Sequence, residues 1–250
     1  TPAVKPRERA RIAPRSEPRL AWVESAAAAV GLPGLELWMA TAASPGRRGA
    51  VAVNAADASD ESAVPLDGEQ SGLFLGRGIL TGNASARFRV GRGLLLLRER
   101  ATALERLSGA DLGTFMAAAA VVAGAMAAPI GAPQMSKDIE DRARALGKAM
   151  SRKERKALEL EASRLALQPA DPGLFRKSLL ATADRLGLLV AGDIAVAVRV
   201  VGEFVLDPEI PLTTAALTIS PHHERVLDLV RFAVSDDYLA LRRDAGLEEA

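Results

Sequence analysis

The sequence contains no cysteine and only two histidines. The lack of cysteine excludes thiol catalysis, disulfide bonds and thiolate metal ligands, and it favours a cytoplasmic protein over a disulfide-stabilised secreted one. His222 and His223 are adjacent, so on a helix they point in different directions and cannot bind one metal ion as a pair one turn apart. With Glu224 they form at most a weak surface site, and polar residues in the first turn of a helix are the simpler interpretation. We therefore expect no metal and no cofactor.

Motifs for nucleotide binding and serine hydrolysis are also missing. The two Gly-Arg-Gly elements, at residues 76–78 and 91–93, extend neither to a dinucleotide-binding fingerprint nor to a phosphate-binding loop. No G-x-S-x-G sequence is present to expose a nucleophilic serine at a sharp turn. A cluster of carboxylates between Ala55 and Gln70 lacks the spacing of a calcium loop, so a solvated loop is the better interpretation.

The net charge is low, and the charged residues are distributed unevenly along the chain. The net charge is +1, with 49% hydrophobic and 25% charged residues among 250, which is ordinary for a globular protein. Residues 1–18 are basic and rich in proline, which predicts an extended linker, and no aromatic residue is present there to stack on nucleic-acid bases. We expect a single domain over residues 19–250. Because the chain starts at Thr1 with no signal sequence after it, we expect it to be part of a longer protein.

The N-terminal part of the domain has a mixed pattern. A first helix is predicted over 19–31, closed by Gly31 and Pro33. Composition typical of strands follows at Leu35–Ala43, Ala50–Val53 and Leu73–Leu80, which predicts a small sheet of about three or four strands.

From Asn83 onward the pattern is helical. Asn83 or Ser85 is a suitable N-cap for a helix that contains Gly91 and Gly93, each of which costs roughly 1 kcal/mol relative to alanine. The alanine-rich stretch Asp111–Gln134 contains too few large apolar residues to favour a membrane span, so we expect a helix packed inside the domain. Further helices are predicted over 137–149 and 152–166, after Asp171, over about 193–201, and after Ser220 and Ser235.

Two segments resemble the metal-binding helices of a peptidase family. The stretch from Ser85 through Leu97 is similar to the His-Glu-x-x-His helix of gluzincins, the zinc peptidases that include the CAAX prenyl proteases. The stretch Ala181–Leu189 resembles the downstream helix of that family, which supplies the third zinc ligand. Every ligand position differs in this chain. Arg92 and Leu96 stand where the family has its two histidines, Gly93 where it has the glutamate that activates water, and Leu180 where it has the third ligand.

A wider resemblance covers most of the chain. Residues 18–247 are similar to the C-terminal domain of large tetratricopeptide-repeat proteins of high-GC bacteria, and residues 183–193 and 231–242 carry the closest matches. The resemblance implies a mostly helical α+β fold in which a small sheet packs on a zincin-like helical core. It also implies a non-catalytic pseudo-peptidase domain that binds a protein partner as a scaffold module of a larger repeat protein. A generic helical domain is the alternative interpretation of the same residues.

Asp184 is the one residue of the family pattern that this chain retains. In the family the equivalent aspartate supports a zinc-binding histidine, and here that histidine is Arg92. We therefore predict a buried ion pair between Asp184 and Arg92, with Arg185 or Arg98 as the alternative partner. Two other functions stay open: an enzyme of unrelated mechanism, and a nucleic-acid or membrane-surface binder that works through the basic N-terminal residues. Neither nucleic acid nor a membrane is the partner that the sequence favours.

Overall fold

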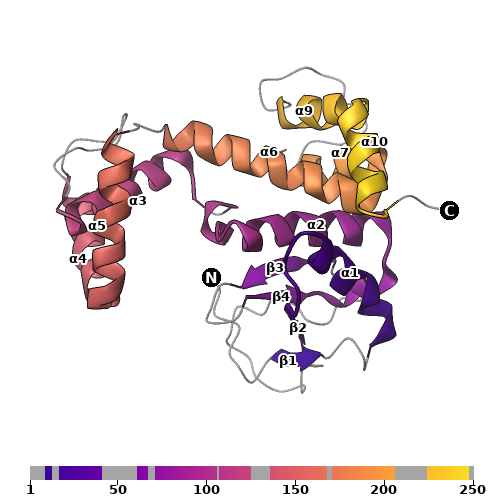
Figure 1. Cartoon of the computed structure of the whole chain (residues 1–250), viewed down its shortest axis with the longest axis horizontal. Helices are drawn as coiled ribbons and strands as arrows, with labels where there is room; N and C mark the ends of the chain where they lie inside the picture. The colour runs from indigo at the N-terminus through magenta and orange to yellow at the C-terminus, as the bar shows by residue number, and fades with distance from the viewer. Residues whose placement is uncertain are drawn as a thin grey trace. The chain divides into compact units, whose positions relative to one another are not determined.

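The chain forms two compact units. One comprises Thr1–Thr102 with Ala181–Ala250, and the other comprises Ala103–Leu180. The single domain expected over residues 19–250 stays a prediction. The computed structural model describes residues 9–12, 17–40, 61–66, 71–105, 107–124, 136–167, 171–205 and 224–247 (Figure 1).

The first unit contains a four-stranded mixed sheet of order β1-β2-β4-β3. Its strands are β1 (Arg9–Ile12), β2 (Glu36–Ala40), β3 (Ala63–Leu66) and β4 (Gly72–Leu75). The central pair β2 and β4 is parallel, and both outer pairs are antiparallel. The expected α+β class, mostly helical with a small sheet, is confirmed.

Two details of the sheet differ from the sequence prediction, and a third lies outside the described residues. β1 lies inside the segment expected to be linker, so the 1–18 linker is wrong for Arg9–Ile12, whose backbone pairs with β2. β3 lies inside the segment interpreted as a solvated acidic loop, because its short Ala-Val-Pro-Leu run pairs with β4. The expected strand at Ala50–Val53 lies outside the described residues.

Helices on the N-terminal side cover the sheet. The 3₁₀ turn η3 (Pro18–Leu20) leads into α1 (Ala21–Ala29), and η4 (Arg77–Thr81) leads into α2 (Ala84–Arg98). Asn83 caps α2, since its side-chain oxygen accepts a hydrogen bond from the Ala86 N–H at 2.8 Å. The aliphatic side of α2 packs on β3 and β4. A core forms there from buried side chains of η3, α1, β2, β4, η4 and α2: Leu20, Val23, Leu37, Leu73, Leu75, Ile79, Val90 and Leu94.

The C-terminal helices bury the other side of α2. They are the second half of α6 (Pro172–Ala191), α7 (Ile194–Val205), α9 (Glu224–Ala233) and α10 (Asp236–Asp244). A second core joins them to α2 through Phe88, Leu188, Ala197, Val200, Val201, Val226 and Leu229. Because α2 is enclosed by the sheet and by these helices, nearly all of its residues after the first turn are buried.

The second unit is built on an alanine-rich helix, against which two charged helices pack. Its helices are α3 (Gly109–Val122), α4 (Lys137–Ala149) and α5 (Arg152–Leu167), with η5 (Thr102–Glu105) at its N-terminal boundary. The alanine-rich stretch forms a packed helix as predicted up to Val122, and Ala117 and Ala118 are buried there with Ile139 and Ala143 of α4. The rest of the predicted helix, residues 125–134, lies outside the described residues. These mostly small side chains make a small core within this unit. No helix within the described residues is both long enough and apolar enough to cross a bilayer.

Candidate functional site

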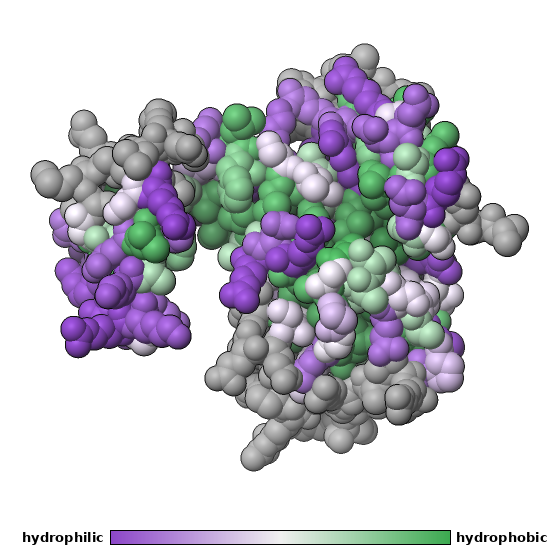
Figure 2. Space-filling model, viewed as in Figure 1, coloured by the Kyte–Doolittle hydropathy of each residue, from purple (hydrophilic) through white to green (hydrophobic). Residues whose placement is uncertain are grey.

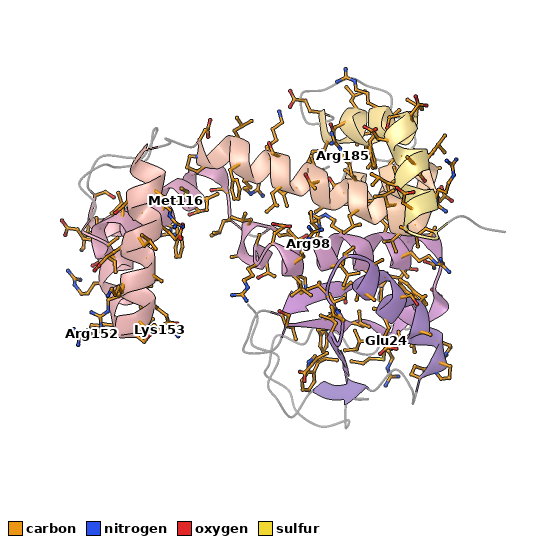
Figure 3. The ribbon with its side chains drawn as sticks, in the orientation of Figure 1. Glu24, Arg98, Met116, Arg152, Lys153 and Arg185 are labelled. Atoms are coloured by element: carbon orange, nitrogen blue, oxygen red, sulfur yellow. The ribbon has the colours of Figure 1, made fainter. Side chains whose placement is uncertain are left out.

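The predicted ion pair between α2 and α6 is confirmed. Arg92 Nε donates a hydrogen bond to Asp184 Oδ1 at 2.8 Å, and the two side chains are only 5% and 1% exposed. Neither alternative partner binds Asp184. Arg185 pairs with Asp228 of α9, and Arg98, labelled with Arg185 in Figure 3, is exposed and lies 3.5 Å from Glu99. Burial of both partners makes this contact unlike the exposed ion pairs elsewhere in the chain.

Asp184 has a second partner that the sequence analysis missed. Arg225 of α9 donates from Nε and Nη2 to Asp184 Oδ2, at 2.9 and 2.6 Å. One sign of this inward orientation is present in the sequence. Arg225, Leu229 and Phe232 recur at positions i, i+4 and i+7, and Leu229 is fully buried. The site is therefore a triad, Arg92–Asp184–Arg225, built from α2, α6 and α9.

A second ion pair runs beside the triad in the opposite sense. Arg185 Nε donates to Asp228 Oδ2 at 2.9 Å, with side chains that are 42% and 33% exposed. Along α6 the acid Asp184 is followed by the base Arg185. Along α9 the base Arg225 is followed by the acid Asp228. This reciprocal order fixes the register of α6 on α9, because sliding one helix along the other would bring like charges together.

A close crossing of α2 and α6 brings the triad together. A Cβ atom added at Gly91 would lie 2.9 Å from the Leu186 carbonyl oxygen, and one added at Gly187 would lie 2.9 Å from the Phe88 carbonyl oxygen. Contacts this short leave no room for a side chain at either position. Gly91 lowers the helix propensity of α2, and it is also the residue of α2 that lets the two backbones approach.

The remaining residues of the peptidase-like pattern are structural. Gly93 faces the sheet, where an added Cβ would lie 3.1 Å from Leu73 Cδ2. Leu96 follows Arg92 by one turn of α2 and is buried, and Leu180 precedes Asp184 by one turn of α6 and is also buried. The structure therefore brings Arg92 and Asp184 into contact, while Gly93, Leu96 and Leu180 serve packing.

The donor set of this pattern does not suit zinc. A guanidinium has no free lone pair for a metal, glycine and leucine side chains have none, and both oxygens of Asp184 already accept hydrogen bonds from arginine. Within the described residues, no group of three or more His, Cys, Asp or Glu side chains is placed to hold a metal ion. His222 and His223 lie outside the described residues.

The electrostatics of the triad are those of a structural element. Two guanidinium groups share one carboxylate, and both the carboxylate and Arg92 are buried. Transfer of such charges from water is costly, and close hydrogen bonds to both carboxylate oxygens offset that cost.

Comparison with known proteins adds no further assignment. No protein-family model matches the chain, and neither a curated protein nor a solved structure matches it.

Proposed function

We propose that this chain is a non-catalytic pseudo-peptidase domain that acts as a protein-binding scaffold module within a larger repeat protein. The observation that carries the proposal is the buried triad Arg92–Asp184–Arg225. Where the resembled peptidases have a zinc ion near the aspartate, this chain has guanidinium groups bound to both carboxylate oxygens.

Charge replacement explains why Asp184 is compatible with the loss of the metal. A buried aspartate without a cation nearby would be strongly destabilising, and Arg92 and Arg225 supply that positive charge. The aspartate then joins three helices instead of orienting a metal ligand. Because Arg92, Leu96 and Leu180 offer no zinc ligand and Gly93 offers no general base, peptide hydrolysis by the zinc route is not expected.

The proposed partner is a protein, and the proposed location is the cytoplasm. The lack of cysteine supports that location, since the fold needs no oxidising compartment. Exposed charged side chains along α4 and α5 support a role in binding a partner, because they take little part in the core of their unit.

The first experiment is elemental analysis of the purified chain, with thermal melts recorded in the presence and absence of a chelator. We expect no stoichiometric zinc and the same melting temperature in both conditions. Zinc bound at one ion per chain, together with a melting temperature that the chelator lowers, would contradict the proposal and favour an enzyme.

A gain-of-metal variant tests the resemblance itself. If the helices correspond to those of the peptidases, Arg92→His, Leu96→His and Leu180→Glu together rebuild the three-ligand set. We expect this triple variant to bind zinc and to be stabilised by it. The matched control is the same variant with Leu96 left unchanged, which has lost one ligand. A folded triple variant with no more zinc than its control would show that the correspondence is wrong.

A further inference from the structure

Positive charge gathers at the turn between α4 and α5. Five basic side chains lie there within nine residues, and each is exposed. We call this group the basic tip: Lys148, Arg152, Lys153, Arg155 and Lys156. The ion pairs of the two helices involve other arginines, so within the described residues no acidic side chain pairs with the basic tip. Figure 2 shows this end of α4 and α5 as a strongly hydrophilic surface, and Arg152 and Lys153 are labelled there in Figure 3.

The stability of the helix does not account for this cluster. The N-terminus of a helix carries partial positive charge, so basic residues in its first turn are unfavourable and acidic ones are favoured. In α5 the order is reversed, and the one acidic residue of the first turn is Glu154. That carboxylate is occupied, because its Oε2 accepts a hydrogen bond from the Ser151 N–H at 2.6 Å. Lys148 ends α4, where a cation is favoured, but the four cations of α5 oppose the helix dipole, and residues that oppose stability are typical of a binding surface.

The size of the basic tip favours a short anionic partner. Residues 152–156 rise only about 6 Å along the helix axis. Beyond them α5 becomes acidic at Glu159 and Glu161, both exposed, which would repel an anion extending along the helix. A duplex nucleic acid, whose charge repeats over many nucleotides, matches this short surface poorly.

The chemistry around the basic tip also separates the possible partners. No aromatic residue is present in α4 or α5, so no platform exists there for stacked bases. The apolar side chains near the cations are the half-buried Met150, two alanines and one exposed leucine, Leu160, which together offer little to insert into a bilayer. Arginine and lysine suit carboxylates, and the arginine fork binds them in a bidentate manner.

We infer that the basic tip binds a short acidic segment of a partner protein. The inference rests on the proposed function, because it assumes that the domain binds a protein partner. It adds the surface used and the chemistry of the partner.

A peptide-binding measurement with the whole chain tests this inference. The probe is a fluorescein-labelled peptide of Glu-Glu-Ala repeats, and affinity is measured by anisotropy over a series of salt concentrations. The test variant replaces four cations of the tip: Arg152→Gln, Lys153→Gln, Arg155→Gln and Lys156→Gln. We expect it to lose roughly tenfold or more in affinity, with a shallower dependence on salt.

A matched variant controls for the loss of total charge. It replaces four exposed cations that lie elsewhere on the two units: Arg77→Gln, Arg100→Gln, Lys137→Gln and Arg231→Gln. We expect this control to bind the peptide nearly as well as the unmodified chain. A third variant, Lys5→Gln with Arg7→Gln, removes charge from the basic N-terminal residues and is also expected to retain binding. Circular dichroism establishes that each variant is folded.

Several results would overturn the inference. One is that the unmodified chain does not bind the peptide at low salt. Another is that the tip variant and the scattered control lose affinity equally. A third is that replacing Lys5 and Arg7 alone lowers the affinity for the peptide. Tighter binding of duplex DNA, of single-stranded RNA or of phosphatidylserine vesicles than of the peptide would overturn it as well. The zinc measurement is separate, so a chain without zinc that ignores the peptide would contradict this inference and leave the non-catalytic assignment standing.

Discussion

Gly187 of α6 lies so close to Phe88 of α2 that an added Cβ would be 2.9 Å from the Phe88 carbonyl oxygen and 2.9 Å from its ring. A backbone oxygen cannot move aside as the end of a flexible side chain can. We therefore expect Gly187→Ala to push the helices apart and to cost about 1–3 kcal/mol of unfolding free energy or more. Urea denaturation followed by circular dichroism measures this cost. An unchanged midpoint would show that the crossing is looser than the structure has it.

Gly113 provides the matched control for this substitution. It lies within α3, and a Cβ added there would meet nothing within 4 Å. Alanine at this position should stabilise its unit by about 0.4–1 kcal/mol, because it lowers the conformational entropy of the unfolded chain. The two glycine-to-alanine changes thus have opposite expected signs, and the difference arises from the close approach at Gly187.

Asp184→Asn should be strongly destabilising. The amide removes the carboxylate charge to which the guanidiniums of Arg92 and Arg225 both donate, so two cations would meet at a neutral side chain. Removal of one partner from a buried ion pair typically costs about 3–5 kcal/mol. We expect a loss of this size in urea denaturation, and a loss of less than about 1 kcal/mol would show that the triad is solvated.

Asp228→Asn is the companion control, because Asp228 pairs with Arg185 from the same two helices. The side chains of this pair are 33% and 42% exposed, so water screens their attraction. Exposed ion pairs contribute about 0–1 kcal/mol, and we expect a loss in that range. Equal losses for Asp184→Asn and Asp228→Asn would contradict the distinction between the buried and the exposed contact.

Local chemistry made the helix boundaries predictable. Helices predicted over 137–149 and 152–166 are observed at Lys137–Ala149 and Arg152–Leu167, since Ser136 and Ser151 cap them as their sequences indicate. Each cap involves residues within a few positions of one another. A single sequence therefore contains the information needed to place these ends.

Contacts between distant segments were harder to predict. The Asp184–Arg92 pair followed from a family resemblance, but Arg225 was missed because nothing local sets its partner 41 residues away. Likewise, β1 and β3 are short and gain their stability from neighbouring strands instead of their own composition. Gly91 was counted against its helix because the close approach of α6 is visible only in three dimensions.

The capping box of α5 predicts a dependence of stability on pH. Hydrogen bonds from the side chain and the backbone N–H of Ser151 hold the pKa of Glu154 below its ordinary value of 4.5. A carboxyl whose pKa is lowered on folding stabilises the folded state above the unfolded pKa, and this contribution is lost as pH falls through the folded pKa. Glu154→Ala should therefore lower the melting temperature more at about pH 7 than at about pH 3.

The control for this pH effect is Glu159→Ala on the same helix. Glu159 is exposed and takes no part in the cap, so its replacement should change the melting temperature less at neutral pH. Thermal melts of both variants, recorded by circular dichroism from acidic to neutral pH, make the comparison. A deficit of Glu154→Ala that grows on acidification would contradict the assigned role of the carboxylate.

Lys153→Gln should raise the melting temperature of the chain in the absence of any partner. Lys153 lies in the first turn of α5, where its charge opposes the helix dipole and repels the other cations of the basic tip. Relief of such a contact contributes about 0.3–1 kcal/mol at low salt, and high salt should remove the gain.

Lys148→Gln is the comparison, because Lys148 lies in the last turn of α4, where the dipole favours a cation. Its replacement should give a smaller rise or a fall. A lower melting temperature for Lys153→Gln would mean that this lysine stabilises the fold, and the case for a binding surface built at the expense of stability would fail.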